Sequence, residues 1–63
     1  MSDQQVISKC YEDTIQRVFT TFYQAYVIAK SDEEQRVAEQ KFSVGIKFAR
    51  EVRDRAIAIL PAG

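Results

Sequence analysis

The chain has 63 residues, with 9 basic and 9 acidic side chains, a formal net charge of zero and no histidine. This length allows at most one small domain, and the balanced charge excludes a global basic field for nucleic acid. The single cysteine cannot form an intramolecular disulfide, and the ordinary zinc sites need histidine or further cysteines. Cores of this size rarely supply more than about 3–5 kcal/mol without a staple, so we expect stabilisation by oligomerisation.

The first predicted element is a helix over residues 3–30. Ser2 fits its N-cap and Gln5 the third helical position, which together make a capping box. Met1 and Val6 occupy the positions of a hydrophobic staple. At about 100° per residue, the apolar side chains fall within one stripe roughly 120° wide. This stripe contains Ile7, Tyr11, Ile15, Val18, Phe19, Phe22, Ala25, Tyr26 and Ala29.

A second helix is predicted over residues 32–60, directly after a tight turn at about residues 30–32. Ser31 begins another capping box, in which its hydroxyl accepts a backbone N–H while Glu34 reaches back to the cap. Acidic residues follow Ser31, and negative charge is favoured at a helix N-terminus. Pro61 prevents the helix from continuing. Its inward stripe contains Ala38, Phe42, Gly45, Phe48, Ala49, Val52, Ala56, Ile59 and Leu60.

Folding the chain into an antiparallel hairpin places residues that are equally distant from the turn side by side. Val18 then faces Gly45, and Tyr11 faces Val52. Large side chains on the first helix meet small ones on the second, as an interdigitating core requires. This pairing also gives a reason for glycine at position 45, which costs about 1 kcal/mol relative to alanine in a helix interior.

Both apolar stripes are too wide for two helices to shield from water. In a four-helix bundle each helix touches two neighbours, and two-fold dimers are the commonest oligomers. We therefore expect an all-α fold: one helical-hairpin domain over residues 1–63 that forms a homodimeric four-helix bundle. The predicted core and dimer interface comprises Tyr11, Ile15, Val18, Phe19, Phe22, Tyr26, Phe42, Gly45, Phe48, Ala49 and Val52.

The sequence contains no catalytic, metal-binding or cofactor-binding motif. Glu12, Glu39 and Glu51 lie off the apolar stripes, and neither an acid–base pair nor a nucleophile with its base can be assembled. Cys10 lies beside the predicted dimer interface with only Lys9 close in sequence, so we expect an inert thiol and leave a redox role open. We predict a protein that is not an enzyme and takes no cofactor and no metal ion.

Two further groups of side chains are candidates for function. A candidate surface for a protein partner comprises Tyr23, Val27, Ile46 and Ile57. A candidate anion or RNA patch late in the second helix comprises Lys47, Arg50, Arg53 and Arg55. Cations near a helix C-terminus are also favoured by the helix dipole alone, so the second group has a purely structural interpretation as well.

The favoured interpretation is a non-enzymatic homodimer that acts as a protein–protein interaction module or adaptor for an unidentified protein partner. The predicted shape resembles Rop-type plasmid copy-control hairpins, which dimerise into four antiparallel helices. This resemblance lies in architecture and not in sequence, and it implies an RNA-binding regulator as the alternative. A third interpretation is an accessory subunit that completes a heteromeric helical bundle.

The sequence also gives an expectation about location. No signal peptide is recognisable, and the longest apolar run, over residues 25–29, is far too short for a bilayer. We therefore expect a cytoplasmic setting without membrane contact. The relative orientation of the two hairpins in a dimer is left open.

Overall fold

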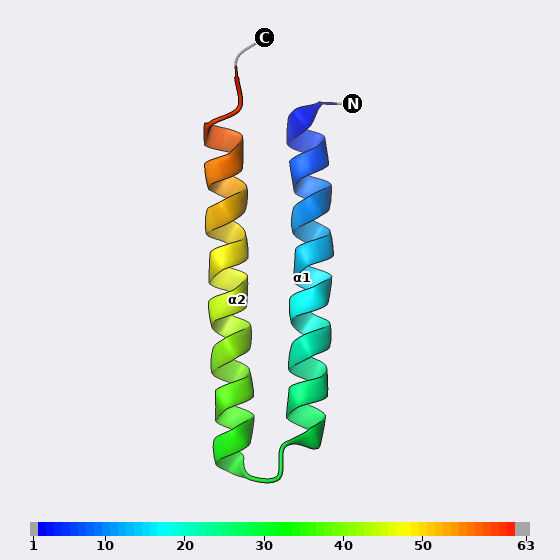
Figure 1. Ribbon diagram of the computed structural model, residues 1–63, viewed down its shortest axis with the longest axis vertical. Helices are drawn as coiled ribbons and strands as arrows, with labels where there is room; N and C mark the ends of the chain where they lie inside the picture. The colour runs from blue at the N-terminus through cyan, green and yellow to red at the C-terminus, as the bar shows by residue number, and fades with distance from the viewer. Residues whose placement is uncertain (1, 62–63) are drawn as a thin grey trace.

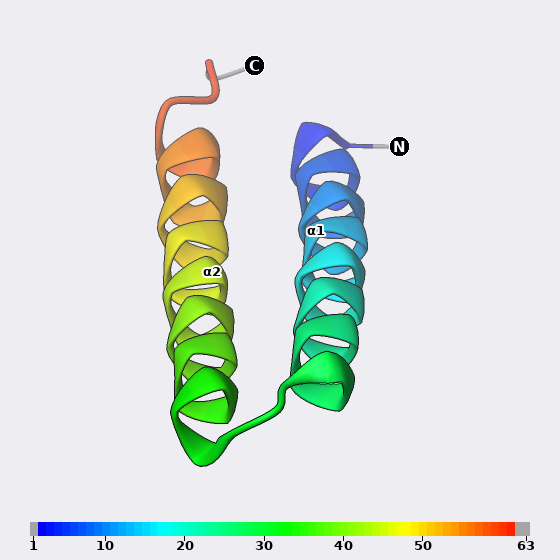
Figure 2. The ribbon, with the colours of Figure 1, turned by 60° about the horizontal axis from the view of Figure 1, so that its bottom comes forward.

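The computed structural model describes residues 2–61, which form two antiparallel helices joined by a short turn (Figure 1). Helix α1 spans Asp3–Ile28 and helix α2 spans Asp32–Ala58. The start of α1 and the end of α2 lie at the same end of the hairpin, opposite the turn (Figure 2). The predicted all-α antiparallel hairpin is therefore confirmed. The hydrophobic staple predicted between Met1 and Val6 involves Met1, which lies outside the described residues.

Each helix ends for a local reason, about two residues before the end predicted from the sequence. α1 stops at Ile28 because the next residue, Ala29, adopts extended backbone angles of φ −62° and ψ 136°. At the end of α2, the N–H of Ile59 still donates to the carbonyl of Arg55. Pro61 then disfavours helical angles at the residue before it, so the chain leaves the helix.

Serine hydroxyls cap both helices at their N-termini. The Ser2 hydroxyl accepts from the Gln5 N–H at 3.2 Å, and the Gln5 side chain accepts from the Ser2 N–H at 3.0 Å, which completes the predicted box. The Ser31 hydroxyl likewise accepts from the Glu34 N–H at 3.2 Å. The Glu34 carboxylate, however, accepts from the N–H of Lys30 at 3.3 Å and not from that of Ser31 as predicted. Glu34 therefore stabilises the turn through its carboxylate and the start of α2 through its backbone N–H.

The two helices pack in the register expected from the sequence. A Cβ built on Gly45 would lie 3.1 Å from Val18 Cγ1, so the two helices approach closely at this point. Nearer the turn, the rings of Phe22 and Phe42 lie 4.8 Å apart between centroids and are tilted by 42°. Large residues of α1 thus meet glycine or a tilted ring of α2.

The hairpin forms a single layer with a thin core. Its Cα atoms extend over 52 × 17 × 7 Å, and their radius of gyration is 15.0 Å. A globular chain of this length would have a radius of gyration of about 10.6 Å. Among residues 2–61 the buried hydrophobic residues are Ala38 and Ala49, both of them small. Because domains enclose a core between at least two packed layers, one hairpin by itself leaves its apolar faces uncovered.

Candidate protein-interaction surfaces

Large apolar side chains are exposed along both helices. Phe19 and Tyr23 of α1 are 54% and 59% exposed, and Phe48 and Val52 of α2 are 58% and 66% exposed. Large apolar side chains exposed in this number are consistent with a partner-binding surface. In the predicted core and interface set, Ala49 is buried and the half-buried residues are Tyr11, Ile15, Val18, Phe22, Phe42 and Gly45. Those that remain exposed are Phe19, Tyr26, Phe48 and Val52.

The contact between Val18 and Gly45 divides the hairpin into two broad faces. Each residue turns by about 100° around its helix. Because the two helices are antiparallel, the residue directly after Val18 and the residue directly after Gly45 lie on the same side of the hairpin. The residues directly before Val18 and Gly45 lie on the opposite side of the hairpin.

We call the first side the aromatic face, which comprises Ile15, Phe19, Tyr23, Tyr26, Ile46 and Ile57. We call the second side the groove face, which comprises Cys10, Thr14, Thr21, Ala25, Val44, Phe48 and Val52.

Aromatic rings dominate the α1 half of the aromatic face. Phe19 and Tyr23 lie 6.4 Å apart between ring centroids, with their planes tilted by 38°. Phe22 and Tyr26 form a second pair at 5.6 Å, tilted by 51°. Phe22 also contacts Phe42 of α2, so the pair of Phe22 and Tyr26 is continuous with the helix–helix contact. The interface residue Phe19 and the partner-surface residue Tyr23, assigned separately from the sequence, lie beside each other.

The four residues of the candidate partner surface divide between two environments. Tyr23 and Val27 are exposed, at 59% and 63%, as expected for a docking surface. Ile46 and Ile57 are half-buried. The accessible part of this candidate surface is therefore on α1.

The groove face contains three open hollows that follow one another along the hairpin. The central hollow, of ≈ 240 Å³, shares Gly45 with the hollow of ≈ 400 Å³ that lies farther from the turn. It shares Ala25, Ala38 and Lys41 with the hollow of ≈ 600 Å³ beside the turn. The shared residues make the three hollows one continuous groove. The hollow farther from the turn is lined in part by Cys10, Thr14, Phe48 and Val52.

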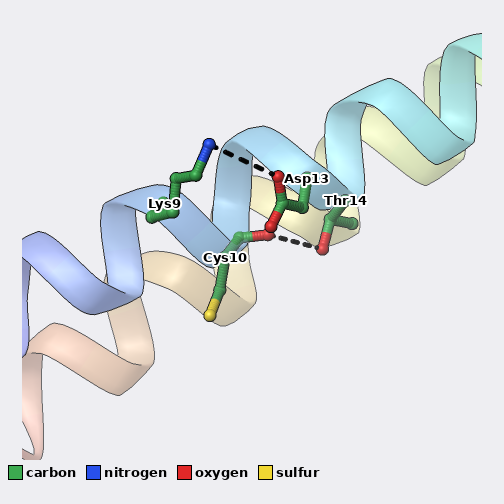
Figure 3. Close-up of polar contacts among 4 residues, drawn as sticks. All are labelled: Lys9, Cys10, Asp13 and Thr14. Atoms are coloured by element: carbon green, nitrogen blue, oxygen red, sulfur yellow. Dashed lines mark hydrogen bonds and ion pairs between the residues drawn. The ribbon is translucent and has the colours of Figure 1, made fainter.

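Cys10 is a free, exposed thiol at this groove. The Nζ of Lys9 pairs with Asp13 Oδ1 at 3.8 Å, and the Cys10 sulfur points away from this ion pair (Figure 3). The Thr14 hydroxyl donates to the Cys10 carbonyl at 3.0 Å. Thr14 is a second small side chain that lines the same hollow as Cys10. The geometry supports Cys10 as a small groove-lining residue.

The basic cluster of α2 does not converge on one site. The Arg53 guanidinium lies over the Tyr11 ring, 4.4 Å from its centroid, and Arg53 Nε donates to Asp54 Oδ1 at 3.0 Å. The hydrogen bond to Asp54 raises the pKa of Arg53 above its ordinary value. Lys47 and Arg50 instead line a separate depression on α2 together with Asp54. The exposed members of the predicted patch are Lys47, Arg50 and Arg55.

Within residues 2–61, no three histidine, cysteine or acidic side chains gather closely enough to hold a metal ion. Neither α1 nor α2 is long and apolar enough to cross a membrane. No protein-family model, curated protein or solved structure matches the chain. The two faces of the hairpin are therefore the features from which we infer function.

Proposed function

We propose that this hairpin is a non-enzymatic protein–protein interaction module that acts as a homodimeric four-helix bundle. The observation that supports the proposal is the missing second layer. The chain has an accessible surface of 5370 Å² at a mass of 7.2 kDa. A compact monomer of that mass exposes about 4,100 Å². The excess of about 1,200 Å² is larger than the roughly 800 Å² that each partner buries in a standard interface.

A second copy of the chain would supply the missing layer without any other component. A compact particle of twice the mass exposes about 6,800 Å², so two hairpins would bury about 3,900 Å² between them. That area falls within the range of obligate dimers, which bury roughly 2,000–5,000 Å². Two-fold packing would also give every helix two helical neighbours.

The same uncovered surface supports an accessory subunit whose partner chain contributes the other two helices. The two proposals differ in what the isolated chain does. A homodimer folds alone, whereas an accessory subunit stays poorly helical or aggregates until its partner is present.

An RNA-binding regulator draws less support from the geometry. Arg53 is held between Tyr11 and Asp54, which leaves Lys47 and Arg50 in one depression of α2 and Arg55 outside it. Phosphate binding gains from several cations that act together, and its affinity would fall steeply with salt.

Thermal unfolding followed by circular dichroism over a dilution series tests the homodimer. Because association stabilises only the folded chain, the Tm of a homodimer should rise with protein concentration. A Tm that is independent of concentration in a helical chain would contradict the proposal. A weakly helical chain at every concentration would favour the accessory subunit.

The adaptor role is tested separately by Tyr23→Asp, which places a charge on the exposed part of the partner surface. Immobilised Tyr23→Asp protein should lose the binding partners that the wild-type protein captures, while its helicity and dimer mass stay unchanged. Gln24→Asp, at the neighbouring exposed position, is the matched control and should still capture them. Equal capture by both variants would remove Tyr23 from the partner surface.

A further inference from the structure

The two broad faces of the hairpin offer different seams for the homodimer proposed above, and the following inference rests on that proposal. Each face measures about 52 by 17 Å across its Cα atoms. Packing one such face against a second copy gives each of the four helices two helical neighbours, as a four-helix bundle requires. A stable dimer thus needs one face, and the other can stay accessible.

Exposed apolar side chains distinguish the two faces along α2. On the flank of α2 that belongs to the aromatic face, Ile46 and Ile57 are half-buried. The exposed large apolar residues of α2 lie on the opposite flank, and they are Val37, Val44, Phe48, Val52 and Ile59. Because the centre of an interface is more apolar than the rest of the surface, the groove face is the better seam.

Shape favours the same face. On the groove face α1 presents small side chains, among them Cys10, Thr14 and Thr21, which leave the hollows open. On the same face α2 presents Phe48 and Val52, whose side chains are more than half exposed on the rim of the groove. Large side chains of one copy and hollows of another are complementary, as knobs and holes are in packed helices.

We infer that a second copy of this chain docks on the groove face, where its Phe48 and Val52 enter the hollows beside Thr14 and Gly45. The aromatic face, with Phe19 and Tyr23, then lies outside the dimer and is the surface left for a protein partner.

Phe48 and Phe19 provide a matched pair of variants. Both are phenylalanines in the middle of a helix, and their exposed fractions are 58% and 54%, but they lie on opposite faces. The dimer dissociation constant of Phe48→Asp and Phe19→Asp is measured by sedimentation equilibrium. Circular dichroism on the same samples compares the helicity of the variants at equal dimer fraction, which is the check on folding. Phe48→Asp should weaken dimerisation by at least about thirtyfold, as the loss of an interface hot spot does. Phe19→Asp should leave the dissociation constant unchanged.

The other outcomes are distinguishable. Loss of the dimer in Phe19→Asp alone, in both variants or in neither would overturn the assignment of the seam. A wild-type chain that is monomeric at every concentration would instead overturn the proposed homodimer itself.

The wild-type chain provides a second readout that does not depend on how the variants fold. Cys10 lines the groove and is exposed in the single hairpin. Its rate of labelling by a maleimide should fall as protein concentration rises and the dimer forms. A rate that stays constant while the mass doubles would place the seam elsewhere.

Discussion

Val18 packs against Gly45 so closely that a Cβ at position 45 would lie 3.1 Å from Val18 Cγ1. Glycine costs about 1 kcal/mol relative to alanine in a helix interior, so its presence here needs a compensation. The compensation is the close approach of α2 to a β-branched side chain that has little freedom to rotate away. This contact fixes the register of the hairpin and divides it into its two faces.

The first prediction concerns Gly45→Ala. In a Val18→Ala background the obstruction is gone, so Gly45→Ala should raise the free energy of unfolding by about 1 kcal/mol. In the wild-type background the added methyl group must displace Val18, and the gain should be smaller or reversed. Urea unfolding of the four variants, at one chain concentration, gives the coupling between the two sites. An equal gain in both backgrounds would show that the approach of Val18 does not constrain position 45.

The second prediction concerns the cap of α2. Ser31→Ala removes the acceptor for the Glu34 N–H and should lower the free energy of unfolding by about 1 kcal/mol. Ser43→Ala is the matched control, because Ser43 is exposed within α2, where alanine is the better helix former. Urea titration should therefore separate the two variants. Equal stability of both would mean that the Ser31 cap contributes nothing.

The third prediction concerns overpacking at the buried surface of α2. Ala49 is 9% exposed, so Ala49→Leu inserts methylene groups where the helices meet and should lower the free energy of unfolding by about 1–3 kcal/mol. Ala58→Leu makes the same change at an exposed position at the end of α2 and should have little effect. If calorimetry found Ala49→Leu as stable as the wild-type protein, the closeness of the two helices at Ala49 would be disproved.

The fourth prediction separates Arg53 from Arg50. Arg53→Gln loses the contact with the Tyr11 ring and the ion pair with Asp54, so its urea midpoint should fall. Arg50→Gln, which lacks the contact with Tyr11, should keep the wild-type midpoint.

The effect of Arg53→Gln should also be insensitive to pH. The hydrogen bond to Asp54 raises the pKa of Arg53, and a raised pKa contributes stability that is lost only when pH rises through it. That loss lies above the ordinary arginine range, so the difference between variants should be constant in neutral and mildly alkaline solution. A midpoint that falls equally in Arg50→Gln would indicate a shared electrostatic role for the two arginines.

Local sequence patterns were sufficient to predict most of the fold. The spacing of Ser2 and Gln5 and of Ser31 and Glu34 locates both helix starts, because a capping hydroxyl must lie three residues before its partner. The stripe periodicity and the position of Gly45 are sufficient for the register. The side chain of Glu34 departs from its predicted partner because the turn leaves the Lys30 N–H within its reach.

The surfaces were harder to predict because periodicity shows which residues are apolar but not which neighbour covers them. Phe19 and Phe22 fall in one predicted stripe, yet the Phe22 ring packs on Phe42 of the other helix, whereas Phe19 is 54% exposed. The sequence placed Arg53 in a basic patch and did not predict that its side chain lies over the Tyr11 ring. Both residues are nearly equally distant from the turn, which is a signal that the hairpin register would have provided. The groove depends on small residues such as Thr14 and Thr21, which no apolar stripe includes.

We propose that the chain needs a second copy of itself to enclose its core. The most direct measurement is size-exclusion chromatography with light scattering over a dilution series, with circular dichroism recorded on each fraction. We expect a helical particle of twice the 7.2 kDa chain mass, which loses mass and helicity together on dilution. A particle of the single-chain mass that stays fully helical at every concentration would contradict it.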